Sequence, residues 1–194
     1  MRQRIIDGAM IELHERGIKF TMDDLARRLG MSKRTLYEHF SSKEELVGSL
    51  LAAAAAELKA KREAIAKDEL LDIREKFRLM MTVRPALWSE STEKLLHDIK
   101  KSMPDQCRKL ESTMDDLWKV IEDLLHEGAQ NGCFRPVFFP AVRIMFKGAY
   151  NELSNYTLLV EHKLTLTEML NAILDILMYG VVVAENETQS VRGK

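Results

Sequence analysis

A short segment near the amino end of the chain carries closely spaced basic, hydroxyl and aromatic side chains. Between Leu25 and Lys43 there are five Lys or Arg residues and one acid, Glu38, on a chain whose net charge is −1. Cations gathered on one face attract nucleic-acid phosphates, and the counterions they release make such binding strongly dependent on salt. Arg34 also has the planar fork that can contact O6 and N7 of guanine. The residues point to duplex DNA as a partner, although a solvated basic face on an ordinary helical hairpin would have the same composition.

Two short helices joined by a tight turn are needed to position these side chains. Apolar residues at helical spacing predict both helices, and the hydroxyls of Thr21 and Ser32 can cap their starts. Gly30 predicts the turn, because only glycine enters the left-handed conformation at no steric cost. The second helix, from Lys33 to about His39, would then enter the major groove as in a helix-turn-helix. The inward positions are those of Leu25, Ala26, Leu29, Leu36 and Phe40.

Together with the residues before it, this segment resembles the DNA-binding domain of TetR-type (tetracycline-repressor-like) transcriptional regulators. The resemblance is carried by Ile5, Ile6, Ala9, Leu13 and Gly17, and then by Thr21, Leu25, Ala26, Leu29, Gly30, Ser32, Thr35 to Tyr37, Phe40, Lys43 and Leu46. It implies that Lys33, Arg34 and Thr35 face the bases or the nearby backbone. It also implies that the phosphates are held by Thr21, Tyr37, His39 and Lys43. Two positions depart from the family pattern: Arg34 stands where a small residue is frequent, and Met22 stands where a second hydroxyl is common.

The composition of the 194-residue chain favours an all-α protein. Hydrophobic residues make up 46%, and there are only four prolines and nine glycines. No apolar run approaches the ~18 residues that a membrane span needs. The first ten residues lack the apolar core of a secretory signal, and Cys107 and Cys133 do not make a disulfide framework. We therefore expect a cytoplasmic protein without a membrane-spanning segment.

Three segments are expected along the chain, with about nine helices in total. Residues 1–48 would form the helix-turn-helix DNA-binding domain, and residues 49–184 an effector-binding and dimerisation domain. Residues 185–194 would be a polar tail. The fourth helix is predicted to run unbroken from about residue 43 into the sixties, because its alanines are strong helix formers. The fifth helix is predicted from apolar spacing over residues 70–81, and residues 134–140 are expected to form a turn.

The last two predicted helices, at about 141–161 and 165–184, indicate a homodimer. The last helix is apolar around most of its circumference, and such a helix must be covered on several sides. One side can be covered by the chain itself, and a second copy would cover the other in a two-fold four-helix interface. The family resemblance implies the same arrangement. Two recognition helices related in this way would read a palindromic operator on double-stranded DNA.

Adaptable and aromatic residues in the middle of the chain could line a cavity for a small-molecule effector. By composition alone, plain core is the more frequent role of such residues. The resemblance implies that an inducer binds in this domain, and that the protein is a repressor released by it. No cofactor is expected. The residues chosen as effector contacts are Met81, Trp88, Met114, Trp118, Phe146 and Tyr150.

Two other classes of function remain as alternatives. A metal-dependent enzyme could use the i, i+4 pairs Glu93–His97 and Glu122–His126, although most such pairs are surface contacts of a helix. The sequence shows no nucleophile motif, no glycine-rich phosphate loop and no zinc-type spacing, so no enzyme activity is expected. The other alternative is a helical interaction protein without any role on DNA.

Overall fold

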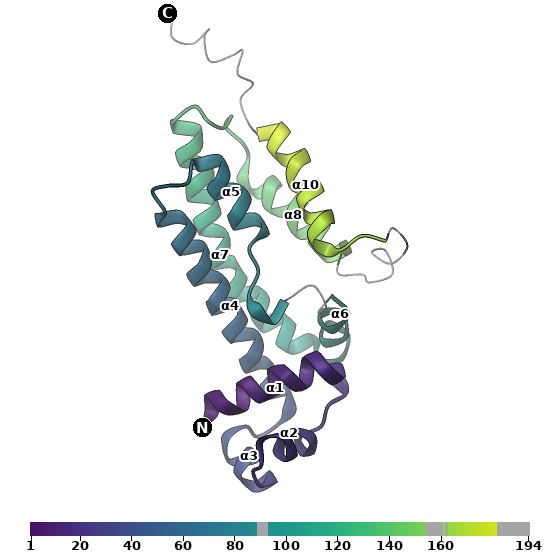
Figure 1. The fold of residues 1–194 in the computed structure, drawn as a ribbon. Helices are drawn as coiled ribbons and strands as arrows, with labels where there is room; N and C mark the ends of the chain where they lie inside the picture. The colour runs from purple at the N-terminus through teal and green to yellow at the C-terminus, as the bar shows by residue number, and fades with distance from the viewer. Residues whose placement is uncertain (89–92, 154–160, 162, 182–194) are drawn as a thin grey trace, which may run out of the picture. The chain divides into compact units, whose positions relative to one another are not determined.

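The structure is a computed structural model that describes residues 1–88, 93–153, 161 and 163–181 (Figure 1). Its elements are helical, which confirms the predicted all-α class. Among the described helices, none combines the length and the apolar character needed to cross a membrane. The helices are α1 (Arg2–Arg16), η1 (Gly17–Lys19), α2 (Met22–Leu29), α3 (Lys33–His39), α4 (Lys43–Lys67), α5 (Ile73–Thr82), η2 (Ala86–Trp88), α6 (Glu93–Ser102), α7 (Pro104–Gln130), α8 (Phe139–Leu153) and α10 (Leu166–Val181).

The chain divides into two compact units, and both α4 and α7 contribute to each of them. The first unit consists of Met1–Leu58 with Arg84–Met114, and the second of Lys59–Val83 with Asp115–Lys194. The predicted boundary between residues 48 and 49 concerns function and stays a prediction. The predicted continuity of the fourth helix is confirmed, since α4 runs from Lys43 to Lys67.

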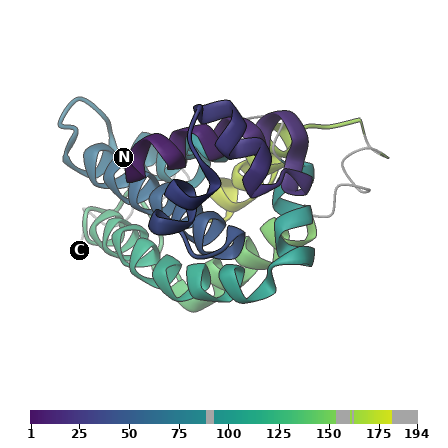
Figure 2. The same ribbon diagram turned by 90° about the horizontal axis from the view of Figure 1, so that it is seen from below.

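In the first unit, α1 packs against α2 and η1, and η1 also contacts α6. The grouping of α1, α2 and α3 can be followed in Figures 1 and 2. Apolar side chains that are at most 1% exposed form the core between these helices and the start of α4. They include Ile5, Leu13, Phe20, Leu25, Leu36, Phe40, Leu46 and Leu50.

In the second unit, α10 packs on both α5 and α8. Its core is built around Phe77, Met80, Ile121, Phe134 and Leu174, which are each at most 1% exposed. The rings of Phe77 and Phe134 meet edge to face with their centroids 5.7 Å apart. The apolar spacing of the second half of the sequence therefore produces a continuous core.

Two predicted helix starts were wrong. Leu70, which was placed on the fifth helix, is 94% exposed and lies in the turn before α5. That helix begins only at Ile73, because Asp72 caps it in a capping box with Glu75. The predicted turn over residues 134–140 is shorter than expected, since α8 already begins at Phe139. The next residue is a proline, which the first turn of a helix tolerates.

Candidate nucleic-acid interface

The helix α2 is fixed at its start by a reciprocal cap. The Thr21 hydroxyl accepts a hydrogen bond from the Asp24 backbone N–H, and the Thr21 N–H donates to the Asp24 carboxylate at 3.0 Å. The hydroxyl also donates to the same carboxylate at 2.6 Å. These hydrogen bonds hold the pKa of Asp24 below its ordinary value, and the bond from the Thr21 hydroxyl has the largest effect. The predicted cap is confirmed, and it engages the hydroxyl that the resemblance assigns to a phosphate.

The turn and the start of α3 also follow the predicted pattern. Gly30 has φ 63° and ψ 33°, the left-handed conformation, and its N–H reaches the carbonyls of Ala26 and Arg27. Ser32 caps α3 by accepting from the Thr35 N–H at 3.1 Å. Leu36 is fully buried. The buried side of α3 is thereby set, and the opposite side of this short helix faces away from the core.

Three of the predicted DNA contacts lie exposed on α3. The Arg34 side chain is 90% exposed, and its Nε lies 3.2 Å from Glu38 on the next turn. Lys33 is 62% exposed and pairs with Asp23 of α2. Tyr37 is 49% exposed. Thr35, in the first turn of the helix, and His39, its last residue, are half-buried.

Lys43, which the resemblance assigns to a phosphate, also has partners within the protein. Its Nζ donates to the Ile18 carbonyl and lies 4.6 Å from the centroid of the Phe20 ring. Burial lowers the pKa of this ammonium group. Lys43 therefore ties the start of α4 to the segment before α2, and its contact with a phosphate stays a prediction.

The other arginines of this segment have acidic partners outside the stretch from Leu25 to Lys43. Arg28 Nε lies 2.6 Å from Glu12, a residue of α1 that is only 1% exposed, and Arg28 also pairs with Glu15. Counting charges within that stretch alone thus overestimated the cationic surface, because the fold brings carboxylates from α1 and the start of α2 onto it. The further ion pairs are Arg16–Glu12, Arg16–Asp24 and Arg27–Asp24.

Two arginines at the start of α1 were missed by the sequence reasoning. Arg2 donates to the Ser49 hydroxyl at 2.9 Å, and its guanidinium lies 4.5 Å from the centroid of the Phe40 ring. Arg4 donates to the Leu29 carbonyl at 2.9 Å, at the end of α2. Their partners are 25 to 47 positions away, so no local spacing announces them.

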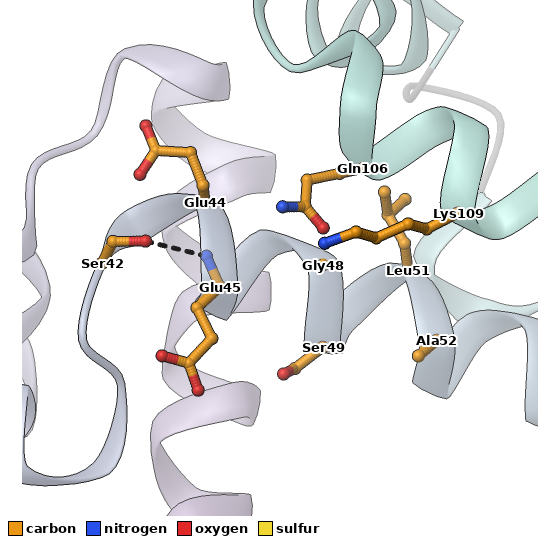
Figure 3. A pocket seen from close by; sticks show the side chains of 9 residues that line it. All are labelled: Ser42, Glu44, Glu45, Gly48, Ser49, Leu51, Ala52, Gln106 and Lys109. Atoms are coloured by element: carbon orange, nitrogen blue, oxygen red, sulfur yellow. Dashed lines mark hydrogen bonds between the residues drawn. The ribbon is translucent and has the colours of Figure 1, made fainter.

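A groove of about 430 Å³ with both polar and apolar lining lies in the first unit, between the start of α4 and α7 (Figure 3). Glu44, Glu45 and Gly48 line it from α4, and Gln106 and Lys109 line it from α7. The Gln106 amide lies where a Cβ on residue 48 would stand, so a larger residue there would displace this side chain. The lining differs from the mostly apolar pockets that small-molecule effectors prefer.

The residues predicted to contact an effector belong, where described, to the core of the second unit. Trp118, Phe146 and Met81 are 8%, 6% and 3% exposed, and Tyr150 packs against them. The Trp118 ring meets those of Phe139 and Phe146 edge to face, with centroids 6.4 and 5.9 Å apart. The side chains of Trp88 and Met114 lie outside the described part of the structure.

The candidate metal pair Glu122–His126 has other partners. Glu122 lies 3.5 Å from Lys119, and the His126 ring lies 3.0 Å from the Gln130 amide. The side chain of Glu93, from the other pair, is outside the described residues. Within the described residues, no three His, Cys, Asp or Glu side chains come together as a metal site would require.

Comparison with known proteins identifies two relevant sequence similarities. A family model described as bacterial regulatory proteins, tetR family, matches residues 5–50. An uncharacterized HTH-type transcriptional regulator of Bacillus subtilis (strain 168), YvaF, is 31% identical over 185 residues. That alignment covers 95% of this chain and 97% of the relative.

Solved structures agree with these similarities. PfmR, a TetR family regulator from Thermus thermophilus, is 28% identical over 74% of this chain and 82% of its own, with a TM-score of 0.56. A regulator from Saccharomonospora viridis in complex with choline has a TM-score of 0.75 at 20% identity, covering 94% and 98% of the two chains. FadR from Bacillus subtilis in complex with stearoyl-CoA has a TM-score of 0.67 at 21% identity, covering 93% and 99%. The latter two share the fold with this chain.

Proposed function

Since this chain belongs to the TetR family of bacterial transcriptional regulators, we propose that it is a dimeric repressor. It binds a palindromic operator and leaves that operator when a small effector binds to its second unit. The observation that carries the proposal is the exposed face of α3, where Arg34 is 90% exposed on a helix whose opposite side is buried through Leu36. In this proposal the protein acts in the cytoplasm and catalyses no reaction.

Base and backbone contacts are assigned to Lys33, Arg34 and Thr35. Phosphate contacts are assigned to Thr21, Tyr37, His39 and Lys43, in the roles that the family resemblance gives them. The ion pair between Arg34 and Glu38 is exposed, and exposed pairs are weak enough to be exchanged for a phosphate or a guanine edge. The groove contacts of α3 therefore become available when DNA approaches.

Alanine substitution of Arg34 and Tyr37 tests the DNA-binding face. Binding of the purified protein to operator duplexes selected from a random pool would be followed by fluorescence anisotropy at several salt concentrations. We expect Arg34→Ala to lose about 5- to 150-fold in affinity, since a good base contact contributes about 1–3 kcal/mol. Tyr37→Ala should also weaken binding, but the salt slope should stay unchanged, because only a charged side chain that neutralises a phosphate contributes about 0.9 to it.

Lys59→Ala is the matched control for Arg34→Ala. Lys59 is 52% exposed on α4 and pairs with Glu63 four residues later, just as Arg34 pairs with Glu38. Its substitution should leave operator affinity unchanged. If the control and the α3 variants behaved alike, or if no variant changed DNA binding, the helical interaction protein would become the better interpretation.

The second copy is proposed to pack on α8 and α10. Each of these helices leaves large apolar side chains exposed: Ile144 and Met145 on α8 are 70% and 58% exposed, and Ile176 and Tyr179 on α10 are 72% and 91% exposed. A second copy of the same surface would bury them in an isologous four-helix interface. The two α3 helices would then have to lie ~34–36 Å apart, or at a multiple of this, to enter successive major grooves.

Ile176→Glu tests the dimer surface, with Leu70→Glu as its control. Both residues are apolar and largely exposed, but Leu70 lies in the turn before α5. Analytical ultracentrifugation at micromolar concentration should find monomers for Ile176→Glu, and dimers for Leu70→Glu and for the native protein. Monomeric native protein would refute the dimer.

Effector control is proposed to act through α4, which contributes residues to both units. A ligand in the second unit would favour a spacing of the two α3 helices that does not match the operator, so that the population shifts away from the DNA-bound state. The relatives that bind stearoyl-CoA and choline support an organic effector for this chain, without deciding between an anion and a cation.

A further inference from the structure

One arginine lies inside the second unit, and none of the described carboxylates pairs with it. Arg62 of α4 is only 6% exposed. Its Nε donates to the Met80 carbonyl at 2.9 Å, and its Nη1 donates to the Leu117 carbonyl at 3.3 Å. Within the described part of the chain, no acid pairs with this guanidinium and its Nη2 makes no hydrogen bond. Because a guanidinium has five N–H donors, part of its bonding capacity has no partner in the described protein, and Nη2 is not among the fully buried atoms left without one.

Arg62 keeps its charge although burial disfavours it. Burial lowers the pKa of Arg62 to about 10, so the group is still protonated at neutral pH. An ionised group that is removed from water is costly unless an opposite charge compensates it, and carbonyl dipoles compensate it only in part. The buried Glu12 of the first unit illustrates the usual solution, because it lies 2.6 Å from Arg28. Arg62 has no such partner in the described structure.

The surroundings of Arg62 are apolar and aromatic. Its guanidinium carbon lies 6.0 Å from the centroid of the Trp118 ring, and Trp118 in turn contacts Phe146. Tyr150 packs against the same cluster. Ligand sites in proteins commonly combine such apolar surface with one or two charged groups that orient the ligand. Four of the residues predicted to contact an effector, Met81, Trp118, Phe146 and Tyr150, thus form or pack against a cluster beside a cation that the sequence reasoning had not singled out.

We propose that the effector is an amphiphilic carboxylate, whose anionic group pairs with Arg62 and whose apolar body packs against Trp118 and Phe146. A guanidinium forms two parallel hydrogen bonds with a carboxylate, which a neutral amide cannot reproduce. A quaternary ammonium ligand would meet a like charge. The inference rests on the proposed effector control, and it goes further by selecting anions over cations. If Arg62 served only to tie α4 to α5 and α7, its substitution would lower stability without changing ligand preference.

Matched probes test this selection directly. Octanoate and octanamide share one shape and differ in charge, as do benzoate and benzamide, and octyltrimethylammonium supplies the cation. Binding to the full-length protein would be followed by tryptophan fluorescence, and release of the selected operator by anisotropy. We expect at least one carboxylate to bind about tenfold or more tighter than its amide, since a hydrogen bond to a charged group is worth about that factor. The cation should not bind.

Variants then assign the preference to Arg62. Arg62→Met should reduce the carboxylate-to-amide ratio to within about twofold, whereas Arg62→Lys, which keeps the charge without the fork, should retain part of it. Lys59→Met is the control on the same helix and should leave the ratio unchanged. If Arg62→Met does not fold, the carboxylate-to-amide ratio is compared between Arg62→Lys and the native protein. A ratio in Arg62→Lys that equals the native ratio would contradict the proposal.

Several results would overturn the proposal. These are equal binding of carboxylates and amides by the native protein, no binding of any carboxylate at millimolar concentration, or a full preference retained in Arg62→Met. A protein that binds no DNA but prefers carboxylates would refute the proposed function and leave the anion site standing. Release of DNA by the cation or by a neutral probe alone would refute the anion site and leave the proposed function standing.

Discussion

Gly30 offers a test of how the recognition helix is positioned, because its substitution isolates a single physical effect. It connects α2 to α3 with φ 63° and ψ 33°. A Cβ built on Gly30 would meet no atom within 4 Å, so an alanine there would not clash with any side chain. Any loss of stability in Gly30→Ala must therefore come from the left-handed backbone itself.

The size of this effect follows from two opposing contributions. An L-residue in the left-handed region costs roughly 1–2 kcal/mol, and replacing glycine by alanine recovers about 0.4–1 kcal/mol through the smaller entropy of the unfolded chain. The net destabilisation should be about 1 kcal/mol, and in a chain of this size that lowers Tm by about 2–4 °C. Asparagine tolerates the left-handed region, and a β-branched residue tolerates it least.

The assay is thermal and urea unfolding of Gly30→Asn, Gly30→Ala and Gly30→Val, followed by circular dichroism. Stability should fall from the native protein through asparagine and alanine to valine. Operator affinity measured below the transition should follow the same order if strain is relieved by moving α3. The backbone explanation would be refuted if Gly30→Ala were as stable as the native protein, or if Gly30→Asn were no more stable than Gly30→Ala.

Three further outcomes follow from contacts elsewhere in the fold. Hydrogen bonds from the Thr21 hydroxyl and then from the Thr21 backbone N–H hold the pKa of Asp24 below its ordinary value. Their stabilisation is therefore fully present above the pKa of the unfolded chain and is lost as pH falls through the folded pKa, and Asp24→Asn should flatten this loss in acid unfolding curves. In Gly128→Ala the new methyl group would overlap the buried Phe134 ring, and overpacking should cost about 1–3 kcal/mol in urea unfolding. Glu12→Gln should lower Tm by several degrees more than Glu15→Gln, because the two acids share one guanidinium but are 1% and 53% exposed; an equal drop would contradict this reasoning.

Local signals in the sequence were sufficient for the helix-turn-helix. The caps at Thr21 and Ser32 and the left-handed Gly30 are properties of a few neighbouring residues, and each is confirmed. The error at Leu70 also has a local origin. An apolar residue at helical spacing was counted as core, although Asp72 and Glu75 already formed the capping-box pattern that starts α5 three residues later, at Ile73.

Contacts between distant residues were not predictable in this way. In the sequence Arg62 resembles the neighbouring cations of α4, and only the fold shows that it is buried beside Trp118. The same holds for Arg2 and Arg4, whose partners lie far along the chain. Spacing identifies which face of a helix is apolar, but the partner of a charged side chain depends on which helices the fold brings together.

The charges near α3 show why this distinction matters for DNA binding. Arg28 is held by the buried carboxylate of Glu12, and separating such a pair leaves an uncompensated charge inside the protein. Arg34 and Lys33 are paired with exposed acids, and exposed pairs contribute little, so a phosphate can replace either acid. Under the proposed function we therefore expect Arg34 and Lys33 to exchange their partners for DNA, whereas Arg28 holds α2 against α1 through Glu12 and Glu15.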